Sequence, residues 1–373
     1  MLQRHLPRSA RDTESRTVTM GLHFSHDTLP QRVHFGTGRA AEYLADEIAR
    51  FGASRVMVIA GRRDADTAAD LSAQLPVALH YSDIVQHVPA ESAERARAAA
   101  RENAVDLLVC LGGGSAVGLA KAIALDTALP IIAIPTTYAG SEATNVWGLT
   151  ENGRKSTGVD AVVLPATVIY DAELSRNLPV GLSVASGLNA MAHCIDSLWG
   201  PRADPINGAL AAEGIRALAT GLPAIVEEPA GLEGREQALY GAYLSAVAFA
   251  SAGSGMHHKI CHVLGGTWNL PHAQTHATVL PYVLAFNAPQ APVAEARIAS
   301  ALGTDTAIGG LNALRKRLDA PRALKDYGFT TQDIPEAVSL ILPAIPTNNP
   351  REVTAANLTE LLTAAHEGST PGP

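Results

Sequence analysis

Short apolar runs alternate with alanine-rich stretches through the first half of this 373-residue chain, and this alternation restricts its fold more than any other feature. The apolar runs lie at residues 32–35, 55–60, 106–111, 130–134 and 166–170. The stretches between them, at 40–51, 67–75, 92–103 and 116–124, have helical composition. Strands separated by helices in this way are typical of a parallel sheet covered on both faces. The pattern therefore predicts an α/β fold for this half.

The pattern changes near residues 178–179. No convincing strand follows 166–170, and the rest of the chain is rich in Ala, Leu and Glu at helical spacing. We therefore expect a disordered extension at 1–20, an α/β domain at 21–178 and an all-α domain at 179–373.

Composition narrows the class of protein. Hydrophobic residues make up 47% of the chain, which is enough to bury a sizeable core. A formal net charge of -8 argues against nucleic acid as a partner. No uninterrupted apolar run reaches the ~18–20 residues that a membrane span needs. The cysteines Cys110, Cys194 and Cys261 lack disulfide or zinc-ribbon spacing, which favours a reducing, cytoplasmic setting.

A glycine-rich turn carries the first chemical signal. Gly112, Gly113, Gly114 and Ser115 follow an apolar run directly and open the helical stretch 116–124. Glycines let the backbone approach a phosphate closely, and the N–H groups at a helix start favour an anion. The turn lacks the GxGxxG spacing of the Rossmann fingerprint, and a purely structural tight turn is the alternative.

A second polar loop follows the next predicted strand. It reads Pro135-Thr136-Thr137-Tyr138-Ala139-Gly140-Ser141-Glu142. Doubly wound sheets bind ligands at the carboxyl ends of their strands, where this loop and the glycine turn both lie. An ordinary turn leading into a helix cap is the alternative. Two such loops at neighbouring strand ends favour a nucleotide cleft.

Histidines supply the third signal. Of 13 histidines, five fall within twenty residues: His257, His258, His262, His272 and His276. Upstream, Asn189 and His193 are four residues apart, which places both on one face of a helix. Metal ligation, general acid chemistry and binding of an anionic substrate are all open to such a cluster. Of the five lysines, Lys121, Lys155 and Lys259 lie in or beside these motifs, and Lys259 is the candidate for holding a carboxylate.

These motifs together resemble the iron-containing alcohol dehydrogenase superfamily and, within it, the maleylacetate reductases. The matching segments are GGGSAVGLAK (112–121), PTTYAGSE (135–142), NAMAH (189–193) and HHKICHVLGGTWNLPH (257–272). The resemblance runs from about Phe24 to Asn287. It implies a dehydroquinate-synthase-like fold, with an α/β dinucleotide-binding domain, an all-α catalytic domain and the active site between them. It also implies a homodimer or a larger assembly, and we expect a homodimer.

The resemblance implies the following set of cofactor contacts: Gly61, Gly112, Gly113, Gly114, Ser115, Thr136, Thr137 and Lys155. The strand at 55–60 is followed by Gly61, Arg62 and Arg63, with no carboxylate before Asp64. We therefore expect NADH or NADPH as cofactor, with Arg62 or Arg63 near a 2′-phosphate; solvated arginines are the alternative.

The chain differs from the wider superfamily at one of the metal-ligand positions. Metal-dependent members bind iron or zinc through an Asp and three His, and these positions are Asn189, His193, His258 and His272 here. The loss of the carboxylate resembles the reductase branch, so we expect that metal is not required. If the protein is metal-dependent, His193, His258 and His272 are the expected ligands.

The implied reaction reduces the C=C bond of maleylacetate, a small dicarboxylate, to 3-oxoadipate. We expect His258 and His272 to polarise the ketone, and His262 or His193 to donate a proton or position the substrate. Lys259 and Tyr138 are the expected substrate contacts. The alternatives are a metal-dependent alcohol or aldehyde dehydrogenase of the same superfamily, a reductase of another oxo-acid, and a non-catalytic nucleotide-binding protein.

Overall fold

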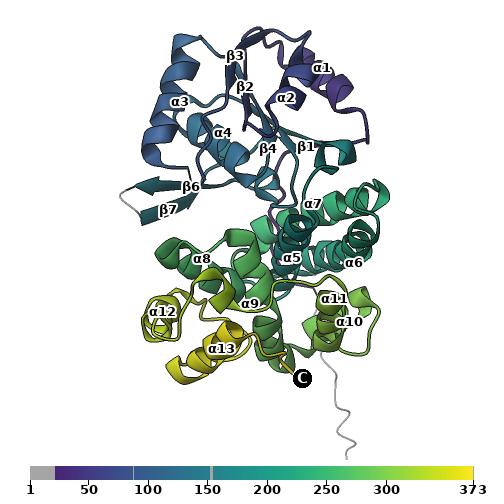
Figure 1. Ribbon diagram of the computed structural model, residues 1–373, viewed down its shortest axis with the longest axis vertical. Coiled ribbons are helices and arrows are strands. Elements are labelled where there is room, and N and C mark those ends of the chain that lie inside the picture. Colours follow the sequence, from purple (N-terminus) through teal and green to yellow (C-terminus); the bar gives the residue numbers. More distant parts are fainter. Residues whose placement is uncertain (1–21, 87, 152–153, 373) are drawn as a thin grey trace, which may run out of the picture.

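The computed structural model describes residues 22–86, 88–151 and 154–372, with the side chains of 154 and 155 outside the described part. The predicted extension at 1–20 lies outside the described residues. Figure 1 shows an α/β half, with strands and α1–α4, packed against a helical half that runs from α5 to the C-terminus. No strand follows residue 170 in the described part of the chain.

A six-stranded parallel sheet forms the centre of the α/β half, in the order β1-β8-β5-β4-β2-β3. Its strands are β1 (Arg32–Phe35), β2 (Val56–Ala60), β3 (Val77–Tyr81), β4 (Leu107–Gly112), β5 (Ile131–Pro135) and β8 (Thr167–Tyr170). Five of these lie within one residue of the predicted strands, which confirms the α/β fold.

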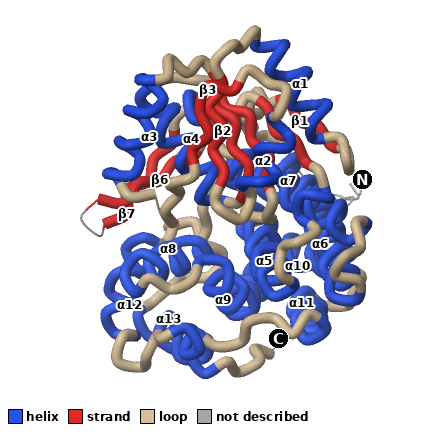
Figure 2. Tube along the Cα trace, turned by 45° about the horizontal axis from the view of Figure 1, so that its top comes forward, coloured by secondary structure: helices blue, strands red, loops and turns tan. Residues whose placement is uncertain are grey.

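Helices cover both faces of this sheet, as Figure 2 shows. They are α1 (Ala40–Phe51), α2 (Ala65–Ser72), α3 (Ala90–Glu102) and α4 (Gly114–Thr127). Alternate residues of β2 belong to different cores: Met57 and Ile59 pack with α3 and α4, whereas Val56 and Val58 pack with α1 and α2. Since both faces are buried, these strands read as continuous apolar runs.

Three strands escaped the sequence analysis. Strand β3 lies at the sheet edge and is only partly buried, so its apolar signal is weak. Strands β6 (Val146–Glu151) and β7 (Arg154–Val159) form a separate antiparallel hairpin. Much of that hairpin is polar, which hid it from a search for apolar runs.

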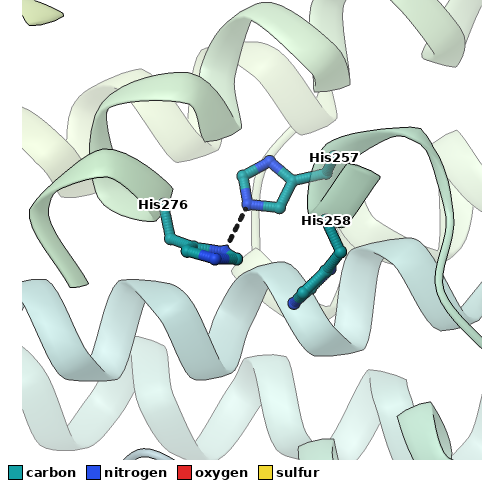
Figure 3. Close-up of side chains that lie close together, drawn as sticks. All are labelled: His257, His258 and His276. Carbon is teal, nitrogen blue, oxygen red and sulfur yellow. Dashed lines mark hydrogen bonds between the residues drawn. The ribbon is translucent and has the colours of Figure 1, made fainter. Parts of the chain in front are cut away.

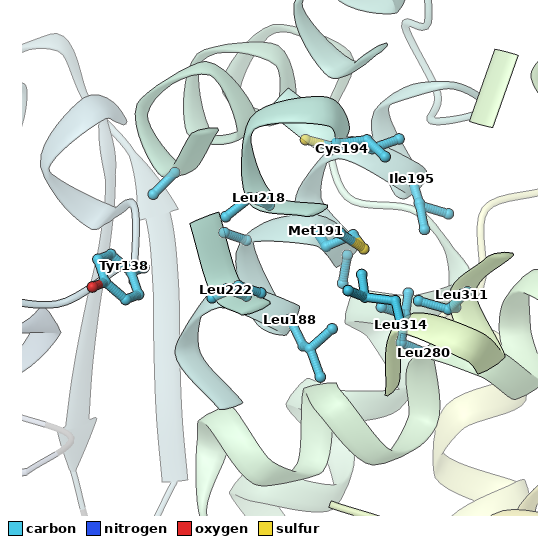
Figure 4. Packing of buried hydrophobic residues seen from close by; sticks show 14 of the residues in the cluster. Tyr138, Leu188, Met191, Cys194, Ile195, Leu218, Leu222, Leu280, Leu311 and Leu314 are labelled. Atoms are coloured by element: carbon cyan, nitrogen blue, oxygen red, sulfur yellow. The ribbon is translucent and has the colours of Figure 1, made fainter. Parts of the chain in front are cut away.

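The helical half is built from α5 (Val180–Ser197), α6 (Pro205–Glu227), α7 (Glu233–Ala252), α8 (Met256–Trp268), α9 (His272–Asn287), α10 (Pro292–Leu302), α11 (Ala307–Arg317), α12 (Ile334–Ile341) and α13 (Ala355–Glu367). Figure 4 shows part of its main core, where Met191 of α5 packs with Leu218 and Leu222 of α6. By length and composition α6 alone among the described helices is able to cross a membrane. It packs along α5 and α7, as a core helix of a folded domain does.

Lys121 of α4 anchors the loop between β5 and β6. Its side chain is buried, and Nζ donates to the carbonyl oxygens of Ser141 (2.7 Å), Thr144 (2.8 Å) and Val146 (2.8 Å). The lysine therefore does not extend to solvent from its helix. Because it holds backbone on both sides of the turn, it fixes the path of the polar loop that follows β5.

Glu47 of α1 is a buried acid whose partners tie α1 to β8 and β1. Its carboxylate accepts hydrogen bonds from Arg50 (2.6 Å), Thr167 Oγ1 (2.6 Å) and His34 Nε2 (3.1 Å). Burial alone would raise the pKa of Glu47, but these donors hold it at about 2. The ionised carboxylate therefore stabilises the folded α/β half.

We expect Glu47→Gln to lower the free energy of unfolding by roughly 2–3 kcal/mol at pH 7. A free glutamate titrates near 4.5, so the contribution of ionised Glu47 is complete above that pH and is lost as pH falls toward 2. Urea unfolding should therefore show a difference in the free energy of unfolding between wild type and variant that becomes smaller from pH 7 to pH 3.

Glu42→Gln, at an exposed pair with Arg39, is the control and should change the free energy of unfolding by less than about 0.5 kcal/mol. A difference that stays constant with pH would contradict the assignment.

Candidate active site

Two polar loops meet at the carboxyl ends of β4 and β5, as predicted. The backbone N–H of Thr136 donates to the carbonyl oxygen of Gly112 at 3.0 Å. A Cβ on Gly113 would come within 2.9 Å of Thr137 Cγ2, so only glycine allows this approach. Gly112 has a φ of +144°, which also favours glycine. Gly114 is exposed at the first turn of α4 and leaves the helix start accessible to an anion.

The other predicted cofactor contacts lie around this edge or outside the described part. Gly61 directly follows β2, and Ser115 lies half-buried in the first turn of α4. Lys155 belongs to β7, but its side chain lies outside the described part of the structure. Asp64, which we did not expect at this site, is half-buried here: its Oδ2 lies 3.4 Å from the position of a Cβ on Gly112.

The histidines of α5, α8 and α9 converge across from these loops. His193 and His258 stack with their ring centroids 4.6 Å apart. Gly140, with a φ of +79°, brings the polar loop against His193, 3.7 Å from the position that a Cβ would take. The structure thus brings the loop of the α/β half and the imidazoles of the helical half to one place.

The imidazoles lie at different depths. His262 and His272 are exposed, whereas His193 is 8% exposed, His258 1% and His276 0%. The exposed fraction therefore separates the histidines that a molecule in solvent can contact from those buried beneath them. Sequence spacing did not reveal it.

Burial also determines the charge of the deeper histidines. Burial, together with a smaller effect of neighbouring imidazoles, lowers the pKa of His193 and of His257 to about 3. The pKa values of His258 and His276 fall well below the ordinary value for the same reasons. These four side chains are therefore neutral near pH 7. A charged imidazolium at His258 is therefore not what this environment favours.

Asp196 is a site residue that the sequence analysis missed. Its Oδ2 lies 2.8 Å from His258 Nδ1 and accepts hydrogen bonds from the backbone N–H groups of Gly255 and His258. Burial raises the pKa of Asp196 to about 7, and those backbone donors oppose the rise. When Asp196 is ionised, its carboxylate makes His258 Nδ1 the donor, so Nε2 keeps its lone pair. Its place on α5, three residues after His193, was the available signal.

Tyr138 does not lie where a substrate contact requires. Its ring is fully buried in the main core, and its hydroxyl faces Arg235 at 3.4 Å. The prediction that Tyr138 contacts substrate is therefore wrong, because the loop directs this side chain into the protein. Lys259 of α8, by contrast, is only partly buried and makes no ion pair among the described residues.

The residues at the superfamily's metal positions carry donor atoms of the kinds that bind a divalent ion. Asn189 Oδ1, His193 Nδ1 and His258 Nε2 are all buried without a hydrogen-bond partner among the described residues. A histidine that binds a metal through one nitrogen usually donates from the other to a carboxylate, as His258 does to Asp196. With His272, these residues offer imidazole nitrogens and one amide oxygen.

Comparison with known proteins identifies the chain as an oxidoreductase and gives its family. The sequence pattern "Iron-containing alcohol dehydrogenase" matches residues 30–172, and "Fe-containing alcohol dehydrogenase family, C-terminal" matches 183–366. The chain belongs to the iron-containing alcohol dehydrogenase family.

Individual relatives cover nearly the whole chain. A maleylacetate reductase of Delftia acidovorans is 44% identical, over 94% of this chain and 100% of its own length. The crystal structure of an iron-containing alcohol dehydrogenase from Corynebacterium glutamicum is 64% identical, with a TM-score of 0.93, over 94% of this chain and 98% of that one. The crystal structure of a maleylacetate reductase from Rhizobium sp. has 43% sequence identity to this chain and a TM-score of 0.89, and the match covers 94% of this chain and 99% of that one.

The family corrects one expectation. We expected from Asn189 that no metal is required, but both matching patterns are those of iron-containing enzymes. The three buried donor atoms without partners are consistent with that correction. An amide in place of the carboxylate changes the ligand set without removing it.

We expect Asp196→Asn to lower activity by about 10–100-fold, since an amide no longer fixes His258 with Nδ1 protonated. Steady-state kcat and KM, with circular dichroism as a check of folding, measure this effect. The control is Asp204→Asn at the start of α6, where Asn still caps the helix, so kcat should change little. Wild-type kcat in a folded Asp196→Asn enzyme would contradict the role of Asp196.

Proposed function

We propose that the chain is an NADH- or NADPH-dependent maleylacetate reductase, which reduces the C=C bond of maleylacetate to give 3-oxoadipate. The observation that carries this proposal is 44% identity to maleylacetate reductases across nearly their full length. The histidine cluster opposite a phosphate-binding turn supports it, because the chemistry needs a hydride donor, charge stabilisation and a proton source at one place.

The steps of the reduction determine which groups the site must contain. Hydride from the nicotinamide adds to the alkene carbon β to the ketone, negative charge moves to the ketone oxygen as an enolate, and a proton then adds at the α carbon. The turn at Gly112–Ser115 and the hydroxyls of Thr136 and Thr137 hold the cofactor's phosphates. The cofactor's position at the strand ends directs its ring toward His193 and His258.

The exposed histidines and Lys259 complete the scheme. His262 and His272 lie at the open side of the cluster, where His262 can supply the proton and His272 is left to bind the metal ion. Lys259 holds a carboxylate of the substrate. When bound by Asn189, His193, His258 and His272, a divalent ion supplies Lewis-acid polarisation of the ketone oxygen.

The proposal includes the oligomeric state of the protein and its location in the cell. We infer a cytoplasmic homodimer that acts on a small dicarboxylate and binds neither nucleic acid nor membrane. The three cysteines are free and buried, which suits a reducing compartment.

The test is oxidation of NADH at 340 nm with maleylacetate, compared with short aldehydes. We expect kcat/KM for maleylacetate to exceed that for any aldehyde by at least about 100-fold. Chelator-treated enzyme should lose this activity and regain it with Fe²⁺ or Zn²⁺. A preference for aldehydes would instead favour an alcohol or aldehyde dehydrogenase, the activity suggested by the name of the Corynebacterium relative.

Asp64 bears on the choice between the two cofactors. Its carboxylate lies beside Gly112, and no hydrogen bond of this side chain occurs among the described residues. Burial raises the pKa of Asp64, and the nearby Arg63 opposes the rise. At this end of the sheet a carboxylate can accept hydrogen bonds from ribose hydroxyls and repel a 2′-phosphate.

We expect both cofactors to be used, and Asp64→Asn to shift the ratio of kcat/KM values toward NADPH by roughly tenfold or more, since it removes a negative charge near the 2′-phosphate. Kd values for NADH and NADPH from fluorescence titration should shift in parallel. Asp66→Asn, an exposed neighbour on α2, is the matched control and should leave the ratio unchanged. An unchanged ratio in Asp64→Asn would place the 2′-hydroxyl elsewhere.

A further inference from the structure

Two histidines lie beneath the site and have no part in the scheme above. His257 of α8 and His276 of α9 are both fully buried, and His257 Nε2 lies 3.0 Å from His276 Nδ1, as Figure 3 shows. His276 occupies the centre of the cluster. Its ring centroid is 4.3 Å from that of His272 and 4.8 Å from that of His258.

His276 repeats the arrangement of His258. In each, Nδ1 has a hydrogen-bond partner, which is Asp196 for His258 and His257 for His276. In each, Nε2 is buried without a partner among the described residues. Ligand atoms of His257, His258 and His276 all lie within 4.8 Å of one another. Buried, unpaired nitrogens on neighbouring imidazole rings suit a shared cation.

A cation bound at His276 Nε2 would fix the direction of the hydrogen bond between the two histidines. Neutral His276 would then carry its proton on Nδ1 and donate it to the single lone pair of His257 Nε2. Cys261 Sγ lies 3.7 Å from the same His257 nitrogen.

We propose that His276 is a metal ligand, which binds a divalent cation through Nε2 together with His258 Nε2 and replaces the carboxylate that Asn189 lacks. His257 is a positioning residue that holds His276 in the required tautomer. Imidazoles without a carboxylate favour Zn²⁺, Co²⁺ or Fe²⁺ over Mg²⁺ or Mn²⁺. The inference rests on the metal dependence of the proposed function and adds a ligand outside the four superfamily positions.

Binding of Co²⁺ to the full-length, chelator-treated protein tests the proposal without relying on turnover. We expect the wild type to bind one Co²⁺ per chain, with visible d–d absorption bands. His276→Gln should weaken binding by about 100-fold or more and alter the bands. His257→Leu should weaken binding by about 10–100-fold with similar band positions, since the ligands remain. His366→Gln, a remote histidine on α13, is the control and should bind as the wild type does.

Crystals of the wild type soaked with Co²⁺ give a second measurement that does not depend on whether a variant folds. We expect an anomalous peak about 2.0–2.2 Å from Nε2 of both His258 and His276. The proposal is overturned if the peak contacts His193, His258 and His272 without His276, or if His276→Gln binds Co²⁺ like the wild type. A wild type that reduces maleylacetate but binds no Co²⁺ would also overturn it and leave the reductase function standing.

Discussion

The hydrogen bond between His258 Nδ1 and Asp196 Oδ2 is the interaction on which the site depends. Both side chains are at most 2% exposed, so the bond forms in a pocket without bulk water and is correspondingly strong. It fixes which nitrogen of His258 carries the proton and turns the other toward the cluster. The surrounding imidazoles are kept neutral by burial, and neutral imidazoles act as ligands and acceptors. We therefore propose the exposed histidine His262 as the proton donor.

The position of this cluster relative to the cofactor loops is set by a second buried group. Arg235 of α7 is 1% exposed, and its guanidinium donates to the carbonyl oxygens of Ser175 and Leu178 in the segment that joins the two halves. It also donates to Pro229 O at 2.8 Å and lies 3.4 Å from the hydroxyl of Tyr138. Backbone carbonyls thus satisfy a buried charge, and the same contacts tie the polar loop and the joining segment to the helical half. Tyr138 belongs to this support of the site.

Sequence reasoning succeeded where burial leaves a strong pattern. The strands at the sheet centre are buried on both faces, so their apolar runs marked them to within one residue, and the two loops at their ends were correctly placed together. It failed where only three-dimensional depth decides. The position of Tyr138 in its loop did not indicate that the side chain turns into the protein. The spacing of the histidines did not separate exposed His262 from buried His276. Asp196 and Asp64 act through neighbours distant in sequence. The division at residues 178–179 stays a prediction.

The central claim is that this site delivers hydride to a conjugated C=C bond and leaves the neighbouring ketone intact. Reduction of maleylacetate with NADH carrying deuterium at the transferred position, followed by NMR of the product, tests the claim directly. The account predicts deuterium on the methylene carbon next to a carboxylate of 3-oxoadipate, two bonds from an unreduced ketone. Deuterium on a carbinol carbon would show that the carbonyl is the hydride acceptor, and would contradict the account.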